Sequence, residues 1–546
     1  MKRNKLIIAI ILLAGILRLF MLSKFPAGLN ADEAALGYNA WSLIETGKDE
    51  HSVSWPLVFR SFDDYKPPLY VYLALPFVKA MGLSVTSVRL PSALLGTISV
   101  YILFLLVKHL FPEKRKSFLP ELSAFILAIS PWHLQFSRGG WEVNVATFFI
   151  LMALLFLYKS FENTKHLFVF VISAVLSLYT YHSARVITPA LILVFSIIYF
   201  KEIKSFFAKS NFKRTILAII FTVVLALPIA FQMLSKEGQS RFSGVSIFSD
   251  PGPAWQSTNF RIEHQNDSLF VKLVHNKFLS YAMRFVQNYQ SHFSPDFQFI
   301  DGDAIPRSRV PEMGENLLFF LPFFVLGFLY VIKFDTPGKK TILSWLFISP
   351  LAAALTYQSP HALRAENMSV PFSVIIAIGL IETCLFVKKY AKKLLPALLT
   401  FVILGTVYGF GRYLHMYYIH YPKELPIAWQ YGFEQIAVYT KANYEKYDHI
   451  IISDRYDQPY ILIAFFTKYP PEKLQKEIVM SSPDKYGFST GRKLDKYEFR
   501  AINYEQDKNI PNALIVSADE KVDDTKIINT VKSLSGEVMY KFISTK

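Results

Sequence analysis

Cysteine is almost absent from this chain, and charged residues are scarce. Cys384 is the only thiol among 546 residues, so no intrachain disulfide and no thiolate metal site can form. Asp, Glu, Lys and Arg together make up only 18% of the sequence. No internal repeat or low-complexity tract is visible, and no small-residue cleavage site follows the first apolar run. These absences exclude a disulfide-bonded scaffold and favour an uncleaved membrane anchor over a signal peptide.

Apolar residues, in contrast, are abundant. They form 52% of the chain, which includes 49 phenylalanines, and the mean hydropathy is +0.29. Several apolar runs are about 17–25 residues long, enough for a helix to cross a hydrocarbon core of ~30 Å. The sequence therefore predicts a mainly α, polytopic membrane helix bundle. We expect eleven spans, near 6–22, 89–108, 118–134, 142–159, 166–182, 184–200, 215–233, 315–332, 341–357, 368–387 and 394–412.

The positive charge indicates orientation in the membrane rather than binding to nucleic acid. The net charge is +16, but much of the excess lies in short loops between predicted spans. Such loops face the cytoplasm by the positive-inside rule, which predicts a cytoplasmic N-terminus and outer loops at 23–88 and 234–314. The apolar segment 69–83 is too short for a span and is predicted to lie at the outer interface. The basic clusters are Lys114-Arg115-Lys116, Lys201, Lys204, Lys213-Arg214, Lys339-Lys340, Lys388-Lys389 and Lys392-Lys393.

The chain changes character after the last predicted span. We divide it into a transmembrane region at 1–412 and a small extracytoplasmic α/β domain at 413–546. Short apolar runs typical of strands occur at 448–453, 512–517 and 537–543. Helices are expected at 426–444, 458–468 and 524–534.

A carboxylate pair and a lysine lie in the first outer loop. Asp32-Glu33 follows the first span, and Lys66 precedes Pro67-Pro68. Asp32 could cap the helix that follows, and it could equally serve as a general base toward an attacking hydroxyl. Lys66 could snorkel, with its charged group in water, as lysines near membrane boundaries often do. It could also bind a lipid phosphate as a point charge. A charged lipid headgroup is the substrate chemistry that this position favours.

Arginines and histidines occur near the outer ends of the spans. Arginines are costly in this place, and binding of a phosphate would explain a cluster of them, although packing or contacts at helix ends is the alternative. None of the histidines has a partner at metal-ligand spacing, so a metal site is weakly supported. Asp301-Gly302-Asp303 is first of all a turn, although the pattern can also hold a divalent cation. The residues concerned are Arg89, Arg138, Arg185, Arg364, His133, His182 and His361.

The order and spacing of several motifs resemble the lipid-phosphosugar-dependent GT-C glycosyltransferases. More narrowly, the chain is similar to bacterial relatives of protein O-mannosyltransferases and lipid A aminoarabinose transferases (glycosyltransferase family 39-like). The resemblance covers residues 6–200 and departs where Tyr65 stands in place of an acid directly before the lysine, with Asp64 one position away. The matching motifs are Asp32-Glu33-Ala34 with Tyr38, Lys66-Pro67-Pro68-Leu69-Tyr70, Arg89-Leu90-Pro91-Ser92-Ala93, Ser130-Pro131 and Ser137-Arg138.

The resemblance implies an enzyme that moves a single sugar, with inversion, from a polyprenyl-phosphate donor to an acceptor hydroxyl on the outer face of the membrane. Asp32 would be the base, Glu33 its acidic neighbour, and Lys66 and Arg138 would neutralise the departing phosphate. Arg89 and Arg364 are further candidates for the phosphate, and Tyr38, Asp64, Tyr65, His182 and His361 for the substrates. The need for a divalent cation stays open, as do the sugar and the acceptor, which could be a lipid, a glycan or a protein.

There are three alternatives to a single-sugar transferase. One is a binding protein whose C-terminal region recruits a partner, and the presence of Asp32, Lys66 and Arg138 together argues against it. A polymerase or ligase that transfers whole glycans from a lipid diphosphate would also need outer-face arginines. A transporter of polyprenyl-linked sugars would place ionisable residues at mid-depth of the bilayer and would carry paired broken helices. Neither feature is visible in the sequence, so the transporter ranks lower.

Overall fold

The computed structural model describes residues 2–112, 117–209, 211–235, 238, 244–264, 268–333, 338–484 and 487–546. The basic cluster Lys114-Arg115-Lys116 lies outside these residues. Contacts between Cα atoms divide the chain into two compact units. Unit 1 comprises Met1–Leu17, Leu95–Ser137 and Glu142–Leu414, and unit 2 comprises Arg18–Leu94, Arg138–Trp141 and His415–Lys546.

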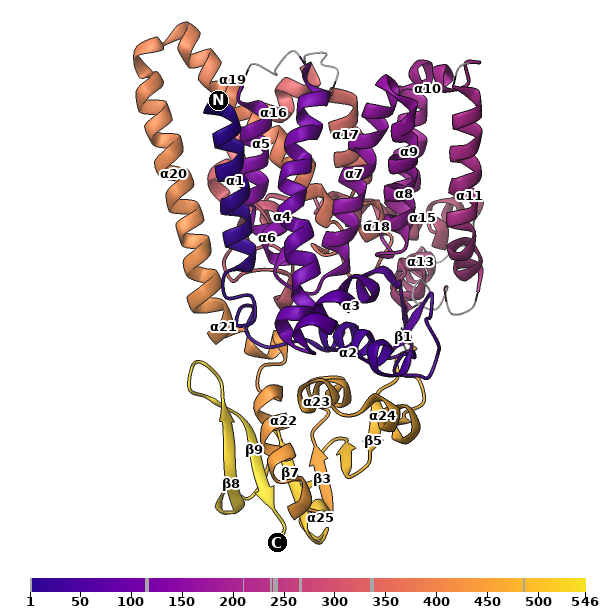
Figure 1. Ribbon diagram of the computed structural model, residues 1–546, viewed down its shortest axis with the longest axis vertical. Coiled ribbons are helices and arrows are strands. Elements are labelled where there is room, and N and C mark those ends of the chain that lie inside the picture. Colours follow the sequence, from indigo (N-terminus) through magenta and orange to yellow (C-terminus); the bar gives the residue numbers. More distant parts are fainter. Residues whose placement is uncertain are drawn as a thin grey trace. The chain divides into compact units, whose positions relative to one another are not determined.

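Unit 1 is helical, and its helices run side by side in a bundle (Figure 1). Helices distant in sequence pack together, as α5 and α16 both do against α19. Phe324 and Phe372 stack face to face between α16 and α19, with ring centroids 4.3 Å apart. The helices are α1 (Lys2–Leu19), α4 (Val85–Leu110), α5 (Leu119–Ala128), α6 (Pro131–Ser137), α7 (Glu142–Glu162), α8 (Leu167–Leu178), α9 (Ala184–Ile198), α10 (Phe200–Phe206), α11 (Phe212–Leu234), α13 (Gly252–Glu263), α14 (Leu269–Val274), α15 (Lys277–Ser291), α16 (Leu321–Lys333), α17 (Lys339–Ile348), α18 (Leu351–Ala354), α19 (Ser369–Tyr390) and α20 (Leu395–His415).

Each of the eleven predicted spans contains a helix, but many of the helices are shorter than expected. Among the described residues, five helices are long and apolar enough to cross a membrane, and a sixth if the bent pair α9 and α10 is one span. The mainly helical membrane bundle is thus confirmed, and the number of eleven stays a prediction. The interfacial segment predicted at 69–83 forms the short apolar helix α3 (Leu69–Met81).

Two of the predicted spans are broken at prolines. The span expected at 118–134 ends as α5 at Ala128, and α6 begins at Pro131. The span expected at 341–357 ends as α17 at Ile348, and Pro350 precedes the short α18. Proline has no amide hydrogen and disfavours helical backbone in the residue before it, so both Ser-Pro steps interrupt the helix.

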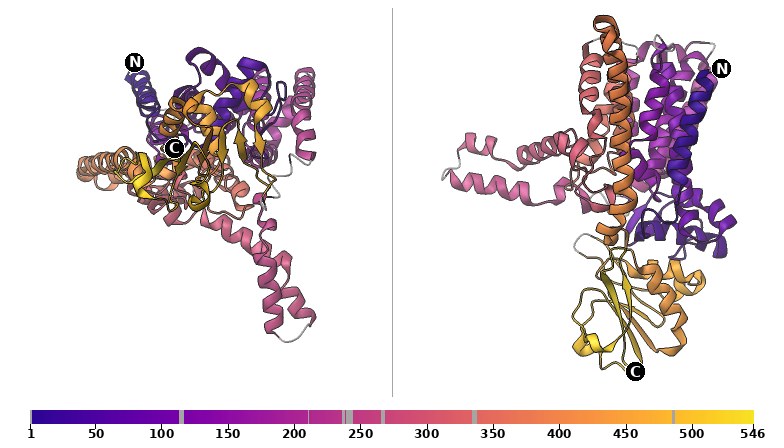
Figure 2. Two further views of the ribbon diagram at one scale, coloured as in Figure 1. Left: turned by 90° about the horizontal axis from the view of Figure 1, so that it is seen from below. Right: turned by 90° about the vertical axis from the view of Figure 1, so that its left-hand side faces the viewer.

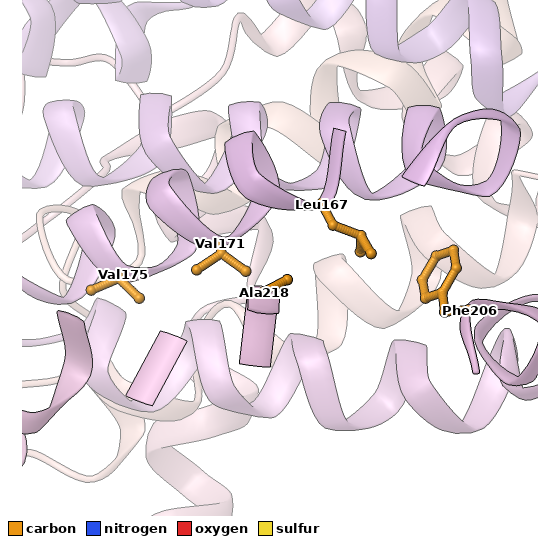
Figure 3. Close-up of a cluster of buried hydrophobic side chains, with 5 residues drawn as sticks. All are labelled: Leu167, Val171, Val175, Phe206 and Ala218. Carbon is orange, nitrogen blue, oxygen red and sulfur yellow. The ribbon is translucent and has the colours of Figure 1, made fainter. Parts of the chain in front are cut away.

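The side of unit 1 around α8 has an apolar core of its own (Figure 3). Leu167, Val171 and Val175 recur at a spacing of four along α8, which places them on one face of the helix. Phe206 from α10 and Ala218 from α11 close over this face. The outer side of α11 stays exposed and apolar, as expected of a helix that faces lipid.

Unit 2 contains a seven-stranded mixed sheet in the order β4-β5-β6-β3-β7-β9-β8. The central β3 pairs in parallel with β6 and β7, and the remaining pairs are antiparallel. The strands are β3 (His449–Ile452), β4 (Val479–Met480), β5 (Gly491–Leu494), β6 (Tyr497–Phe499), β7 (Ala513–Ser517), β8 (Ile527–Lys532) and β9 (Val538–Ser544), and the helices among them are α22 (Phe433–Ala442), α23 (Pro459–Thr467), α24 (Pro471–Glu477) and α25 (Tyr504–Asp507).

Three of the strands occur where the sequence predicted them, as β3, β7 and β9, and one predicted helix is wrong. The segment 524–534 contains β8, an edge strand that pairs antiparallel with β9. Its Ile527, Ile528, Thr530 and Val531 are β-branched, which favours extended backbone. Helices were correctly expected near 433–442 and 459–467.

Unit 2 also contains the outer segment that carries the predicted site. Its elements are α2 (Ala31–Thr46), the hairpin of β1 (Phe59–Ser61) and β2 (Asp64–Lys66), and α3. Contacts from beyond residue 415 hold α2 in place. The Tyr38 hydroxyl donates to the carbonyl of Tyr469 (2.7 Å), and Gln475 Nε2 donates to Ser42 Oγ (3.1 Å) near the other end of the helix.

A long helical hairpin projects from unit 1, built mainly by α13 and α15 (Figure 2, right). It arises from the second predicted outer loop, where the sequence gave no assignment of helices. The base of α15 packs against the short α18.

Candidate active site

The first turn of α2 is fixed by a capping box. Asn30 is the N-cap residue: its side chain accepts a hydrogen bond from the Glu33 amide (3.0 Å), and Glu33 Oε2 accepts one from the Asn30 amide (3.4 Å). Capping by Asp32 itself, one of the two predicted roles, is therefore taken by Asn30. Asp32 lies one residue inside the helix, where the N-terminal dipole favours a negative charge.

The β1–β2 hairpin carries Lys66 to Asp32. Lys66 is the last residue of β2 and pairs with Phe59 across the hairpin. Its Nζ lies 2.6 Å from Asp32 Oδ1 and 5.4 Å from the centre of the Phe62 ring. The lysine side chain is 6% exposed, whereas that of Asp32 is 33% exposed. The side chain of the acid is thus one-third exposed, while the cation beside it is sheltered.

The neighbouring acid, Glu33, is fully buried against Arg89. Both side chains are 0% exposed, and Arg89 Nε lies 2.8 Å from Glu33 Oε1. The amide of Gly140 donates a further hydrogen bond to Glu33 Oε1 (2.7 Å). A side chain at position 140 would bring its Cβ within 3.2 Å of Glu33 Cγ, so glycine permits this approach.

Arg89 holds the chain after the first span in place. Its Nη1 donates to the carbonyls of Leu22 (3.1 Å) and Pro26 (3.0 Å), and its Nη2 to Gly28 (2.6 Å) and to Glu33 Oε2 (3.0 Å). With the bond from Nε, all five N–H groups of the guanidinium are used. These contacts hold the segment after the first span, and the roles predicted for Arg89 at the phosphate and for Glu33 beside the base stay predictions.

Arg138 is likewise buried, with 1% of its surface exposed. Its Nη2 donates to the carbonyls of Phe20 (2.8 Å) and Phe25 (3.2 Å), and its Nε to the Tyr417 hydroxyl (3.1 Å). The guanidinium also lies over the Tyr417 ring, 5.3 Å from the centre. In this structure Arg138 joins the end of the first span to the segment after α20.

The tyrosines and the acid near Lys66 have different surroundings. Tyr38 is fully buried, and burial raises the pKa of its phenol above the usual value. Asp64 lies on the same face of β2 as Lys66 and is buried, whereas Tyr65 lies on the other face and is partly exposed. Asp64 thus shares a strand face with Lys66, and Tyr38 donates its hydroxyl to Tyr469 in the interior, while their predicted contacts with the substrates stay predictions.

The remaining predicted residues, His182, His361 and Arg364, belong to unit 1. His182 is partly exposed after α8, and Arg364 Nη1 donates to Thr356 Oγ1 (2.6 Å). His361 is buried, with Nδ1 3.4 Å from Asp303 Oδ2. Burial lowers the pKa of His361 to about 4, with a further contribution from the Arg364 charge.

Asp303, the second acid of Asp301-Gly302-Asp303, joins two loops of unit 1. Its carboxylate accepts hydrogen bonds from the amides of Ile305 (2.9 Å) and Ala362 (2.7 Å), and Gly302 has a left-handed backbone with φ 73°. Burial alone would raise the pKa of Asp303, but the bonds from His361 and the two amides lower it overall. Among the residues that the structure describes, no three His, Cys, Asp or Glu side chains are placed to hold a metal ion.

Two residues important to this region were not predicted. Gln430 Oε1 accepts a hydrogen bond from the Ala31 amide at the start of α2 (2.6 Å). Glu50 is buried between α2 and α23, where Asn39 Nδ2 (2.9 Å), Ser61 Oγ (3.3 Å) and the Tyr460 hydroxyl (3.2 Å) donate to its carboxylate. Gln430 is about 400 residues from its partner, and no local pattern marks such a contact.

Comparison with known proteins finds one matching family model and several similar structures. Residues 65–229 match the family model described as dolichyl-phosphate-mannose-protein mannosyltransferase. No curated protein sequence matches the chain significantly. The structure is similar to that of ArnT from Cupriavidus metallidurans, with a TM-score of 0.54 and 11% identity over 100% of this chain and 98% of ArnT. It is also similar to the Archaeoglobus fulgidus oligosaccharyltransferase, with a TM-score of 0.51 and 13% identity over 87% of this chain and 68% of that protein.

The chain therefore shares the fold of these two proteins, and its long apolar helices are of a kind that can cross a membrane. The resemblance to GT-C glycosyltransferases that the motifs predicted is thereby confirmed, and the chain has their fold.

Proposed function

We propose that this protein is an inverting glycosyltransferase that moves one sugar from a polyprenyl-phosphate donor to an acceptor hydroxyl at the outer face of the membrane. The observation that carries the proposal is the contact between Asp32 and Lys66. It joins a partly exposed carboxylate to a sheltered cation, the two groups that such a transfer needs. The bundle of apolar helices gives the donor lipid its surroundings.

The reaction needs a base and a cation but no general acid. The acceptor oxygen attacks the anomeric carbon as its proton passes to the Asp32 carboxylate, and the bond from that carbon to the phosphate oxygen breaks. Polyprenyl phosphate leaves as an anion, so a positive charge near it stabilises the transition state. Attack opposite the leaving group inverts the anomeric centre. Without a donor, Lys66 Nζ donates a hydrogen bond to Asp32 Oδ1. The lysine side chain would shift toward the phosphate when the donor binds.

The similar structures support a lipid phosphate as the ligand. ArnT has been solved with undecaprenyl phosphate, at a TM-score of 0.53 and 11% identity, and AglB from Archaeoglobus fulgidus with an inhibitory peptide and a dolichol-phosphate, at 0.50 and 15%. We propose a ligand of this class for the present chain. Arg364, Arg138, His182 and His361 stay candidates for contacts to donor or acceptor, and we expect Tyr65 and Asp64 to line the approach to Lys66.

We further propose that the N-terminus is cytoplasmic and that unit 2 faces outward. The charge distribution of the loops supports this orientation. Because Asp32 and Lys66 follow the first span, the site would then lie on the outer side. Labelling of single cysteines with a membrane-impermeant reagent in intact cells tests this orientation, starting from the Cys384→Ser variant.

The matching oligosaccharyltransferase fold favours one alternative, transfer of a whole glycan from a lipid diphosphate. The purified chain should be incubated with synthetic polyprenyl-phosphate mannose, arabinose, glucose and galactose, and separately with a lipid diphosphate oligosaccharide. Each should be run with and without a chelator, with mass analysis of the products. Transfer of a single sugar supports the proposal, transfer only from the diphosphate supports the alternative, and unchanged donor lipids in all arms would contradict both.

A further inference from the structure

The hairpin formed by α13, α14 and α15 exposes an unusual amount of apolar surface. Phe278 is 75% exposed and Leu269 74%, values expected for charged residues on a protein in water. Single exposed apolar residues are common, but here they continue along three successive helices. The large exposed apolar residues of the hairpin are Trp255, Phe260, Ile262, Leu269, Phe270, Leu273, Val274, Phe278, Leu279, Met283 and Val286.

These residues are ordered along α15. Leu279, Met283 and Val286 recur at the three- and four-residue spacing that places them on one face of the helix, and the exposed Phe278 precedes Leu279 in the first turn. Tyr281, Arg284 and Asn288 lie on the opposite face. In a helix that packs on a protein core, the apolar face would be buried, whereas here it is the exposed one.

The polar side of α15 makes the contacts within the protein. Asn288 is buried, and its Nδ2 donates to the carbonyls of Ala354 (3.2 Å) and Thr356 (2.9 Å). The Tyr281 hydroxyl donates to the carbonyl of Asp250 (3.0 Å), and Arg284 lies 3.7 Å from the carboxylate of the same residue. The helix is therefore anchored through its polar groups, and the apolar face on its other side is exposed.

Positive charge accompanies the apolar face. Lys272 lies within α14 beside Leu273, and Lys277 begins α15 with its Nζ 5.3 Å from the centre of the Phe278 ring. Arg261 lies near the end of α13. Aromatic and aliphatic residues with lysines at their edge are the composition of helices that lie in a membrane interface and meet acidic headgroups.

We propose that the α13–α15 hairpin is an interfacial element, whose apolar face inserts into the interface of the bilayer that unit 1 spans. The partner of this face is lipid, because the hairpin projects sideways from the helix bundle of unit 1 (Figure 2). The bilayer that surrounds this bundle would therefore meet the hairpin. Its lysines would meet the phosphates of acidic lipids. The inference does not depend on the proposed glycosyl transfer.

Spin labels on the full chain test this proposal. In a Cys384→Ser background, Phe278→Cys and Met283→Cys place the label at exposed apolar positions of α15, and Lys521→Cys, at an exposed charged position after β7, is the control in water. The proteins are reconstituted in vesicles of phosphatidylcholine with phosphatidylglycerol. Collision of each label with oxygen, which concentrates in lipid, is compared with collision with a water-soluble nickel complex.

We expect a higher ratio of oxygen to nickel collisions at 278 and 283 than at 521, and a smaller difference when phosphatidylglycerol is replaced by phosphatidylcholine. Equal ratios at the three positions would mean that the face lies in water and would overturn the proposal. Labels at 278 and 283 shielded from both reagents would also overturn it, since they would indicate a protein partner or a second copy. All three positions are at the surface, so the melting temperatures should agree and exclude misfolding.

Discussion

Asp32 and Glu33 are adjacent in sequence and each contacts a cation, but their surroundings differ. Glu33 and Arg89 are wholly buried, and every N–H group of the arginine is used. Asp32 is one-third exposed and meets a lysine on a short hairpin. The first pair is enclosed in the interior, and the acid of the second pair is partly exposed.

The difference follows from helix geometry. Successive residues on a helix are turned by about 100°, so the two side chains leave α2 in different directions. A buried ion pair contributes specificity of packing, and its loss leaves an unpaired charge in the interior. A partly exposed acid can exchange a proton with a bound substrate. Adjacent acids in a motif therefore need not share a role.

The largest effect should come from Asp32→Asn. Loss of a general base lowers turnover by roughly 10²–10⁴-fold, whereas the fold should be kept because Asn30 caps the helix. Turnover of the purified variant with its donor lipid measures this effect. Glu45→Gln, an exposed change on the same helix, is the control. An Asp32→Asn enzyme with full turnover would remove Asp32 from the mechanism.

Glu33→Ala should act on stability instead. Removal of one partner of a buried pair costs about 3–5 kcal/mol, because Arg89 would keep its charge without the carboxylate. Thermal unfolding in detergent measures the loss. Activity should decline only as the folded fraction declines. A variant that folds normally but fails in turnover would show that Glu33 takes part in the reaction.

Lys66→Ala should weaken use of the donor. A hydrogen bond to a charged group contributes about 1.5–3 kcal/mol, which corresponds to roughly tenfold or more in the apparent affinity for the lipid phosphate. The KM for the donor should rise while the melting temperature changes little. The exposed Lys79→Ala on α3 serves as the matched control. Identical donor kinetics in the two variants would argue against a phosphate contact.

Glu50→Gln should produce the smallest effect, and it should depend on pH. Burial raises the pKa of Glu50, so the folded protein holds this proton more tightly than the unfolded chain. The contribution of this group to stability is then present below the unfolded pKa of about 4.3 and lost as the pH rises through the folded pKa. The glutamine variant does not titrate at this position. Its free energy of unfolding should therefore increase relative to that of the wild type as the pH rises. Parallel profiles from pH 4 to 8 would contradict this expectation.

The sequence predicted much of this arrangement because apolar length and motif order are local properties. The positions of the helices followed from apolar runs, and β3 and β7 from short continuous runs of Ile, Leu and Val. The two prolines that break α5 from α6 and α17 from α18 were visible, but a long apolar run on both sides concealed the breaks.

The residue contacts were predicted less well. The sequence brought Asp32 and Lys66 to one region, and their contact agrees with that expectation. The sequence could not show that Arg89 donates to the carbonyls of Leu22, Pro26 and Gly28, because every residue has a backbone carbonyl and no residue type marks which one accepts. The contact of Gln430 with Ala31 was invisible for the same reason.

The attachment of α2 to late parts of the chain has a consequence for biogenesis. Gln430 meets its first amide, Tyr469 accepts from Tyr38, and Gln475 donates to Ser42. During translation these partners emerge from the ribosome more than 380 residues after the helix that they hold. The segment with the candidate site therefore lacks these contacts until most of the protein has been synthesised, and a chain that stops at residue 414 should insert its helices and still leave α2 without its partners.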